Sequence, residues 1–156
     1  KRQTERQTSA HNTVVINSED QTQVWGGFRV AERAQIKNLK EGFDFVEAEH
    51  DGYKKIGVSH LRKFLIDKSL VQINDTIVND SNYNQTAYFH LHPSLKNLII
   101  NENSIIIENY ITMFFTGTNV ILNKEIYEYA EEFNKIKKAI VIKVTFESNL
   151  ETLIKL

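Results

Sequence analysis

The sequence predicts an all-β protein, an antiparallel two-sheet β-sandwich with roughly a dozen short strands. Short runs rich in β-branched and aromatic residues recur along the chain, and many of them alternate apolar with polar side chains. Clusters of Asn, Asp, Ser and Gly separate these runs at close spacing, as turns do in antiparallel sheets. Helical segments do not alternate with the strand signals, which argues against a parallel α/β sheet.

Each predicted strand has a local reason. Residues 13–16 form a β-branched run that ends in the turn-forming sequence Asn-Ser-Glu-Asp. The pattern is clearest over residues 86–92, where apolar residues alternate with Tyr and His, and Pro93 ends the strand because proline cannot donate to a ladder. The predicted strands are residues 13–16, 28–36, 43–50, 60–66, 70–78, 86–92, 98–100, 105–107, 110–115, 120–122, 139–146 and 152–154.

One segment does not fit the strand pattern. Residues 124–138 are rich in Glu, Tyr, Ala and Lys, and Tyr129 and Phe133 have the i, i+4 spacing of one helix face. The segment is predicted to be either a helix or an irregular loop between strands, and its aromatic residues, with Tyr127, are predicted to belong to the core.

Length and composition fit a single domain over residues 1–156, with 41% hydrophobic residues to fill one core. The 19 Lys and Arg and the 20 Asp and Glu give a formal net charge of -1, so no global field would attract nucleic acid or an anionic membrane. No run approaches the ~18 apolar residues that span a bilayer. Cysteine is absent, which excludes disulfides and thiol chemistry.

The start of the chain suggests a longer parent protein. The first residue is Lys1, the only methionine is Met113, and the apolar core of a signal peptide is absent. We therefore expect a fragment or a processed product, with its sandwich truncated at the N-terminus.

A compact polar group precedes the first strand. Arg6, His11 and Asn12 lie directly before a β-branched run that can anchor them in a sheet. Farther along, Trp25 adjoins two glycines and offers a flat ring for sugar stacking, while Arg29 could pair with a carboxylate or a sulfate. We predict substrate contacts from Arg6, Asn12, Trp25 and Arg29, and His11 is the first residue to inspect.

Four motifs occur in a recognisable order. They are Arg-Gln-Thr-Ser-Ala-His-Asn-Thr-Val at 6–14, Trp-Gly-Gly-Phe-Arg-Val at 25–30, Ala-Glu-His-Asp-Gly-Tyr at 48–53 and Phe-His-Leu-His-Pro at 89–93. On these residues the chain resembles the C-terminal β-sandwich domain of the heparinase II/III-like polysaccharide lyases.

The resemblance implies a bacterial parent protein that cleaves a uronic-acid-containing glycan, such as a glycosaminoglycan, by β-elimination. It also implies an N-terminal α/α-toroid as partner domain, export to the periplasm or secretion, and in some members a zinc ion, for which His11 would be a ligand. An upstream His-x-His-x-Asp segment, which carries a catalytic His and further ligands in the family, is missing from this chain. We therefore expect no catalytic residue, no bound zinc and no lyase activity in the isolated chain.

Each of the predicted functional residues could instead have a purely structural role. His11 could be a hydrogen-bonded histidine at a strand entry, Trp25 could be a packing residue, and either arginine could form an ordinary ion pair. His90 and His92 share one strand face, which fits shared metal binding or an ordinary aromatic and imidazole layer.

Two further alternatives remain open at this stage. His50, Asp51 and Tyr53 could form an acid–base group, although Asp-Gly favours a turn. At the level of function, the chain could instead be a non-catalytic carbohydrate-binding or structural module of a capsule or lipopolysaccharide cluster protein, or belong to a parent that has lost catalysis.

Overall fold

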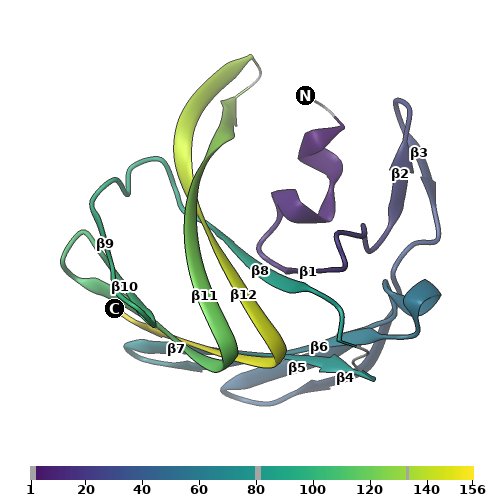
Figure 1. Ribbon diagram of the computed structural model, residues 1–156, viewed down its shortest axis with the longest axis horizontal. Coiled ribbons are helices and arrows are strands. Elements are labelled where there is room, and N and C mark those ends of the chain that lie inside the picture. The colour runs from purple at the N-terminus through teal and green to yellow at the C-terminus, as the bar shows by residue number, and fades with distance from the viewer. Residues whose placement is uncertain (1–2, 80–81, 133) are drawn as a thin grey trace.

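The computed structural model describes residues 3–79, 82–132 and 134–156, and it confirms the all-β class. Figure 1 shows the arrangement of its strands and three short 3-10 helices. The strands are β1 (Val14–Ile16), β2 (Gln23–Trp25), β3 (Arg29–Ala31), β4 (Ile36–Glu41), β5 (Phe45–His50), β6 (Ser59–Asp67), β7 (Leu70–Val78), β8 (Gln85–His90), β9 (Leu98–Ile100), β10 (Ser104–Ile107), β11 (Ile111–Glu132) and β12 (Lys135–Lys155). The 3-10 helices are η1 (Thr4–Arg6), η2 (Thr8–Ala10) and η3 (Lys54–Ile56).

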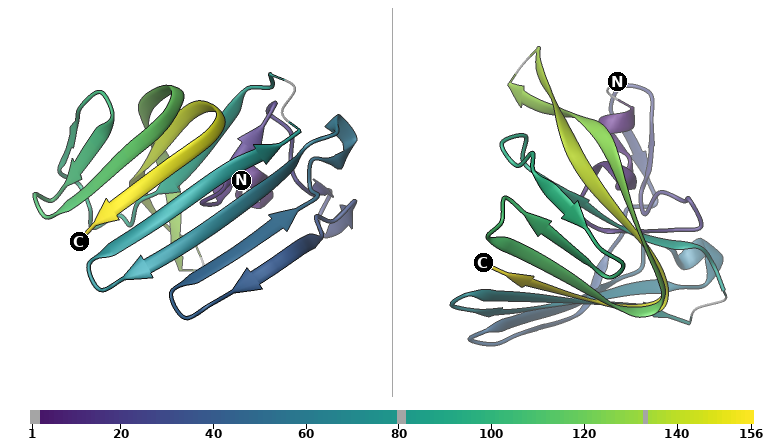
Figure 2. Two further views of the ribbon diagram at one scale, coloured as in Figure 1. Left: turned by 90° about the horizontal axis from the view of Figure 1, so that it is seen from below. Right: turned by 60° about the vertical axis from the view of Figure 1, so that its left-hand side comes forward.

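Two long strands connect the layers of the sandwich. The main sheet has the order β4-β5-β6-β7-β12-β11-β10-β9, and β7 pairs with the C-terminal part of β12 at 149–155. The N-terminal part of β12, at 141–146, pairs instead with β8, and β8 pairs with β1. Because β12 bends between these two partners, β8 and β1 lie over the main sheet, as Figure 2 shows. The hairpin of β2 and β3 forms a separate small sheet.

The core lies between these layers. The upper layer contributes the buried side chains Val14, Ile16, Phe89, Ile142 and Val144. The main sheet contributes Ile73, Ile77, Ile105, Ile107, Met113 and Phe115. Most of these residues occupy alternate positions on their strands, as expected for strands with one face in the core.

The structure corrects some predicted boundaries. Residues 124–138 are neither a helix nor an irregular loop: they belong to β11 and β12 and the turn between them, apart from residue 133, which lies outside the described part. The separate strands predicted at 110–115 and 120–122 are parts of β11, and those at 139–146 and 152–154 are parts of β12. The single strand predicted at 28–36 is interrupted, because β3 ends at Ala31 and β4 begins at Ile36.

Cross-strand pairing explains why 124–138 is extended. Tyr127 lies opposite Ala139, and Glu128 lies opposite Lys138. Lys143 pairs with Glu125 at 2.6 Å across the two strands. These contacts stabilise a β-ribbon and compete with the helix propensity of Glu, Ala and Lys.

Side chains from the loop after β5 and from the main sheet satisfy carbonyls in β1 and just before it, on the side that has no strand neighbour. The hydroxyl of Tyr53 donates to the carbonyl of Val14 at 2.7 Å, and Nη1 of Arg62 donates to the carbonyl of Asn12 at 2.6 Å. Tyr53 is only 1% exposed, and burial raises the pKa of its hydroxyl, which keeps it a donor. These two bonds join the layers where no ladder does.

Arg62 is held in turn by a buried carboxylate. Asp75 on β7 is 1% exposed, and its Oδ1 accepts hydrogen bonds from Nε of Arg62 and Nε2 of His60, both at 2.6 Å. Its Oδ2 accepts from Nη2 of Arg62 at 3.0 Å. Burial alone would raise the pKa of Asp75, but the hydrogen bond from His60 and the charge of Arg62 outweigh it and lower that pKa.

A directed row of hydrogen bonds leads to the same carboxylate. The backbone N–H of Gly52 donates to Nδ1 of His50, so His50 carries its proton on Nε2 and donates to Nδ1 of His60 at 3.1 Å. His60 therefore carries its own proton on Nε2, which faces Asp75. Burial, followed by the charge of His60, lowers the pKa of His50 to about 4. The ring of His50 is therefore neutral at neutral pH.

We predict that Asp75→Asn destabilises the fold by about 3–5 kcal/mol, because the largely buried guanidinium of Arg62 would keep its charge without a carboxylate partner. Urea unfolding measures the change in the free energy of unfolding. Asp67→Asn at the exposed turn after β6 is the control and should change it by less than about 0.5 kcal/mol. Equal effects of the two substitutions would contradict the role given to Asp75.

The histidine row predicts a dependence of stability on pH. His50 has a pKa of about 4 in the fold against an ordinary value of 6.5, so the unfolded chain binds more protons between these values. Stability contributed by neutral His50 is therefore complete above pH 6.5 and falls toward pH 4, by on the order of 3 kcal/mol in total. The lowered pKa of Asp75 adds a further loss below its ordinary value of 3.8.

Urea unfolding at several pH values between about 7 and 4 measures this slope. The control is His50→Gln, which keeps an N–H donor for His60 but cannot titrate, and its stability should depend less on pH in this range. Equal slopes for the wild type and the variant would show that other groups cause the loss.

Candidate functional site

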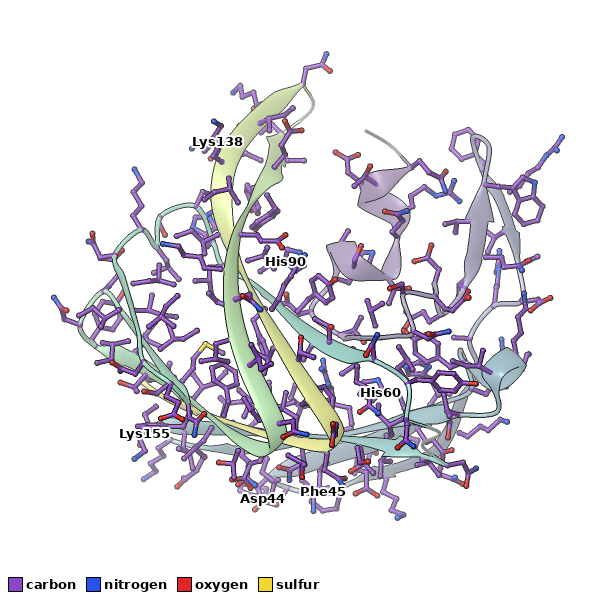
Figure 3. All side chains as sticks on the ribbon, in the orientation of Figure 1. Asp44, Phe45, His60, His90, Lys138 and Lys155 are labelled. Atoms are coloured by element: carbon purple, nitrogen blue, oxygen red, sulfur yellow. The ribbon has the colours of Figure 1, made fainter. Side chains whose placement is uncertain are left out.

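A groove of about 970 Å³ lies between the N-terminal turns and the projecting part of β11 and β12. We call it the imidazole groove, because His11, His90 and His92 line it together with Asn12, Tyr127 and Tyr129. Figure 3 labels His90 on the side of β8 that faces this gap. Glu5 and Glu128 add acidic groups to its rim.

Local hydrogen bonds hold the N-terminal wall of the groove. The backbone N–H of Thr8 donates to Oδ1 of Asp20 at 2.7 Å, and the hydroxyl of Thr8 accepts from the N–H of Gln21 at 2.9 Å. The short helix η2 ends at Ala10, and His11 already has extended backbone angles before β1 begins. This wall is therefore attached to the loop that follows β1.

Asn12 joins this wall to β8. Its Oδ1 accepts the backbone N–H of His90 at 2.7 Å and lies 3.0 Å from Nδ1 of the same residue. The predicted substrate contact of Asn12 stays a prediction, but its side-chain oxygen already has a structural role. Burial, and then the charge of His11, lower the pKa of His90, so its ring is neutral at neutral pH.

Tyrosines form the opposite wall. The rings of Tyr127 and His90 meet edge to face with centroids 4.7 Å apart, and those of Tyr129 and His92 do so at 5.5 Å. The hydroxyl of Tyr127 donates to the carbonyl of Leu91 at 2.9 Å. Burial raises the pKa of Tyr127, so its hydroxyl stays protonated.

His11 also belongs to a neighbouring shallow recess of about 540 Å³, which contains Arg6 and Arg33. Nη1 of Arg6 donates to the carbonyls of Gly26 and Gly27 at 3.2 and 3.0 Å, so this arginine closes the turn between β2 and β3. Within the described part of the chain no ion pair involves Arg33. Arg33 can therefore bind an anion in this recess, beside the exposed imidazole of His11.

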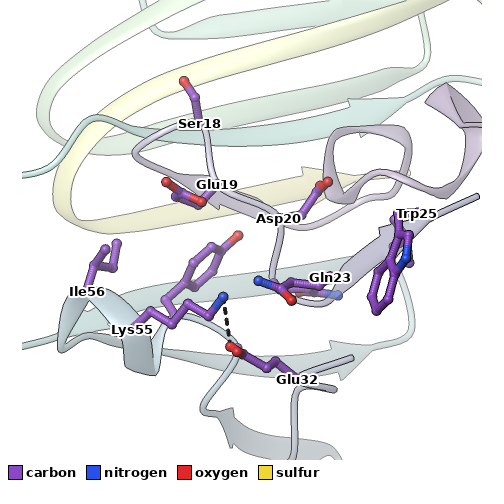
Figure 4. A pocket seen from close by; sticks show the side chains of 12 residues that line it. Ser18, Glu19, Asp20, Gln23, Trp25, Glu32, Lys55 and Ile56 are labelled. Carbon is purple, nitrogen blue, oxygen red and sulfur yellow. Dashed lines mark ion pairs between the residues drawn. The ribbon is translucent and has the colours of Figure 1, made fainter. Parts of the chain in front are cut away.

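Trp25 and Arg29 lie elsewhere. Trp25 is 45% exposed and lines a separate pocket of about 450 Å³, shown in Figure 4. That pocket contains Glu19, Asp20 and Glu32 but a single cation, Lys55, which pairs with Glu32 at 2.8 Å. Arg29 is exposed on β3 and lines neither the groove nor the recess. The structure thus brings the side chains of His11, Asn12 and Arg6 together, while Arg29 meets this group only through its backbone carbonyl, which accepts from Nη2 of Arg6 at 3.4 Å.

The donor set does not make a metal centre by itself. Among residues 3–79, 82–132 and 134–156 no group of three His, Asp or Glu side chains could hold a metal ion. Two other described imidazoles line the groove with His11: those of His90 and His92, which share one wall. A zinc ion at His11 would need ligands from beyond the described residues.

The suggested acid–base group does not form either. Asp51 accepts the N–H of Gln35 at 2.7 Å and pairs with Lys37 at 3.3 Å, while Tyr53 bonds to β1 and His50 to His60. These three side chains hold loops and layers together, in agreement with the turn interpretation.

Sequence reasoning missed some of the residues in and beside the groove. Tyr127 and Tyr129 were expected in the core, but they line the groove, and Phe133 lies outside the described residues. A strand interpretation of 124–138 would have placed these tyrosines on one face at i, i+2. Asp75 lies between Ile73 and Ile77 on the apolar face of β7. The alternation of this strand in the sequence is therefore a signal that the carboxylate is buried.

No helix of the described residues is long and apolar enough to cross a membrane. A sequence search of curated proteins finds no match. The profile of the family Heparinase II/III-like, C-terminal matches residues 1–151.

Solved structures share the fold at low identity. Two structures of heparinase III, the BT4657 gene product, have TM-scores of 0.76 and 0.78 and are 16% identical, covering 96% and 99% of this chain but 24% of theirs. The heparan sulfate lyase HepC from Pedobacter heparinus has a TM-score of 0.72 at 16% identity, over 99% of this chain and 25% of its own. The chain thus spans about a quarter of the length of these proteins. With the family profile matched over nearly its whole length, this chain belongs to the family of heparinase II/III-like C-terminal domains.

Proposed function

We propose that this chain is the glycan-facing C-terminal domain of a polysaccharide lyase that acts on an acidic, uronic-acid-containing glycan by β-elimination. Its imidazole groove and the adjoining recess form one wall of the substrate cleft, and an N-terminal domain of the parent protein supplies the other. Membership in the family supports this function, as do the names of the similar solved structures, a heparinase III and a heparan sulfate lyase.

The single observation that carries the proposal is the position of His11, which lines both the groove and the arginine-containing recess. A glycan bound next to His11 would contact imidazole and tyrosine rings in the groove and arginine side chains in the recess. Neutral rings and tyrosines suit the sugar faces, while Arg33 and Arg6 suit a carboxylate or a sulfate.

The chemistry divides between the two walls. β-Elimination removes the proton beside the uronate carboxyl group, so it needs a base and groups that neutralise the carboxylate as negative charge develops. The arginines of the recess can provide part of this neutralisation. We assign the base to the partner domain, on the opposite side of the cleft. The isolated domain therefore binds the glycan without cleaving it.

We predict that the 156-residue chain produces no unsaturated uronate from heparan sulfate, while the longer protein that contains it does. The rise in ultraviolet absorbance of the unsaturated product measures the reaction. In that longer protein His11→Ala should lower kcat/KM by at least about tenfold, because this residue lies where groove and recess meet. Cleavage by the isolated chain would refute the division of labour, and an inactive longer protein would favour a non-catalytic binding module.

We predict that the arginine recess, and not the tryptophan pocket, carries the affinity for an acidic glycan. Arg33→Gln should weaken binding of a heparan sulfate oligosaccharide by about three- to tenfold, since a charge-assisted hydrogen bond is lost. Trp25→Ala should change it by less than about twofold, because carboxylates outnumber cations in its pocket. Calorimetric titration measures both, and a larger loss for Trp25→Ala would restore the predicted stacking role of the tryptophan.

A further inference from the structure

The two imidazoles at the end of β8 share one wall of the groove, and their proton positions can be assigned from their partners. His90 is the last residue of β8, and His92 follows two residues later. Each ring packs against a tyrosine of β11, which fixes its plane. For each ring Nδ1 takes part in local hydrogen bonds.

His90 carries its proton on Nδ1. The side-chain atom of Asn12 at 2.7 Å from the backbone N–H of His90 must be an acceptor, so it is the amide oxygen. The same oxygen lies 3.0 Å from Nδ1 of His90, which must therefore donate. The neutral ring then has a lone pair on Nε2, and no partner for that atom is found in the described part of the chain.

His92 has the opposite arrangement. The backbone N–H of Ser94 donates to its Nδ1 at 3.3 Å, and the Ser94 hydroxyl lies 2.8 Å from the same atom. Nδ1 is thus an acceptor, and the proton of the neutral ring is on Nε2. His90 offers an acceptor to the groove, and His92 offers a donor.

We propose that His90 and His92 form a matched acceptor and donor pair that binds neighbouring hydroxyl groups of a sugar ring in the imidazole groove. Each hydroxyl both donates and accepts, so adjacent hydroxyls satisfy an acceptor and a donor side by side. Tyr127 and Tyr129 add aromatic surface for the apolar face of the ring. The inference rests on the proposed function and adds the residues that select a polyhydroxylated unit.

The same assignment does not favour a shared metal as the purpose of the pair. A metal ion binds the lone pair of a neutral imidazole, and two ligands would have to present two lone pairs. His92 presents an N–H instead, because its lone pair faces Ser94. This agrees with the absence of a three-ligand metal group among the described residues.

Nitrogen-15 NMR of the histidine-labelled chain tests the proposal at a pH above 7, with a heparan sulfate tetrasaccharide as the probe. The expected spectrum has protonated Nδ1 in His90 and protonated Nε2 in His92, and the tetrasaccharide shifts both Nε2 resonances. His90→Asn keeps an N–H donor for Asn12 but removes the Nε2 acceptor, so affinity should fall about tenfold. His92→Gln keeps a donor near the place of Nε2–H and should bind within about threefold of the wild type, whereas His92→Asn should lose about tenfold.

Tyr110→Phe, at an exposed tyrosine that does not line the groove, is the control and should leave affinity unchanged. Reversed proton positions would overturn the pairing. Asn variants that bind like the wild type, while the tetrasaccharide still shifts the resonances of His11, would overturn the pair and leave the proposed function standing. A tetrasaccharide that shifts no groove resonance would overturn the proposed glycan-facing role together with the pair.

Discussion

The carboxylate of Asp75 connects the interior of this sandwich to its candidate site. It is buried on β7 and orients Arg62, which reaches the carbonyl of Asn12 at the free edge of β1. Asn12 in turn accepts the backbone N–H of His90. One buried charge therefore fixes a row of contacts that ends in the wall of the imidazole groove, and its desolvation is offset because hydrogen bonds reach both oxygens.

This arrangement follows from the way the sheet folds over. Because β12 pairs with β7 along one part and with β8 along another, the upper layer ends at β1, which has a strand neighbour on one side only. The carbonyl of Val14 in β1 accepts from Tyr53 in the loop after β5, and the carbonyl of Asn12, just before β1, accepts from Arg62 of the main sheet. An edge closed by side chains is also protected against pairing with a foreign strand. The groove lies on the outer side of this upper layer, where the N-terminal turns and the β11–β12 ribbon rise beside β8 (Figure 1).

Much of this fold could be predicted from local patterns. The alternation in β7 and β8 and the turn residues between strands identified the all-β class and most strands. The ribbon at 124–138 could not be predicted in the same way, because its extended form depends on cross-strand partners such as Ala139 for Tyr127. Helix propensity is a local property, and pairing across a turn overrides it.

Contacts between distant strands also decide the roles of the polar residues. His60 alone carries no signal in the sequence, since its importance comes from Asp75 on the neighbouring strand and His50 on the other side. Arg6 was predicted as a substrate contact, and the sequence did not show that its guanidinium also bonds to turn carbonyls some twenty residues away. Register and turn geometry, which position these partners, are not encoded in a short motif.

Hydrogen exchange at the backbone amide of His90 in Arg62→Gln tests most directly whether the buried carboxylate maintains the groove. The account predicts that protection of this amide falls at least about tenfold more than protection of amides in the central part of β12, because the partner oxygen of Asn12 is no longer held. An equal fall at both places would mean that Arg62 only stabilises the fold as a whole, and unchanged protection at His90 would contradict the connection altogether.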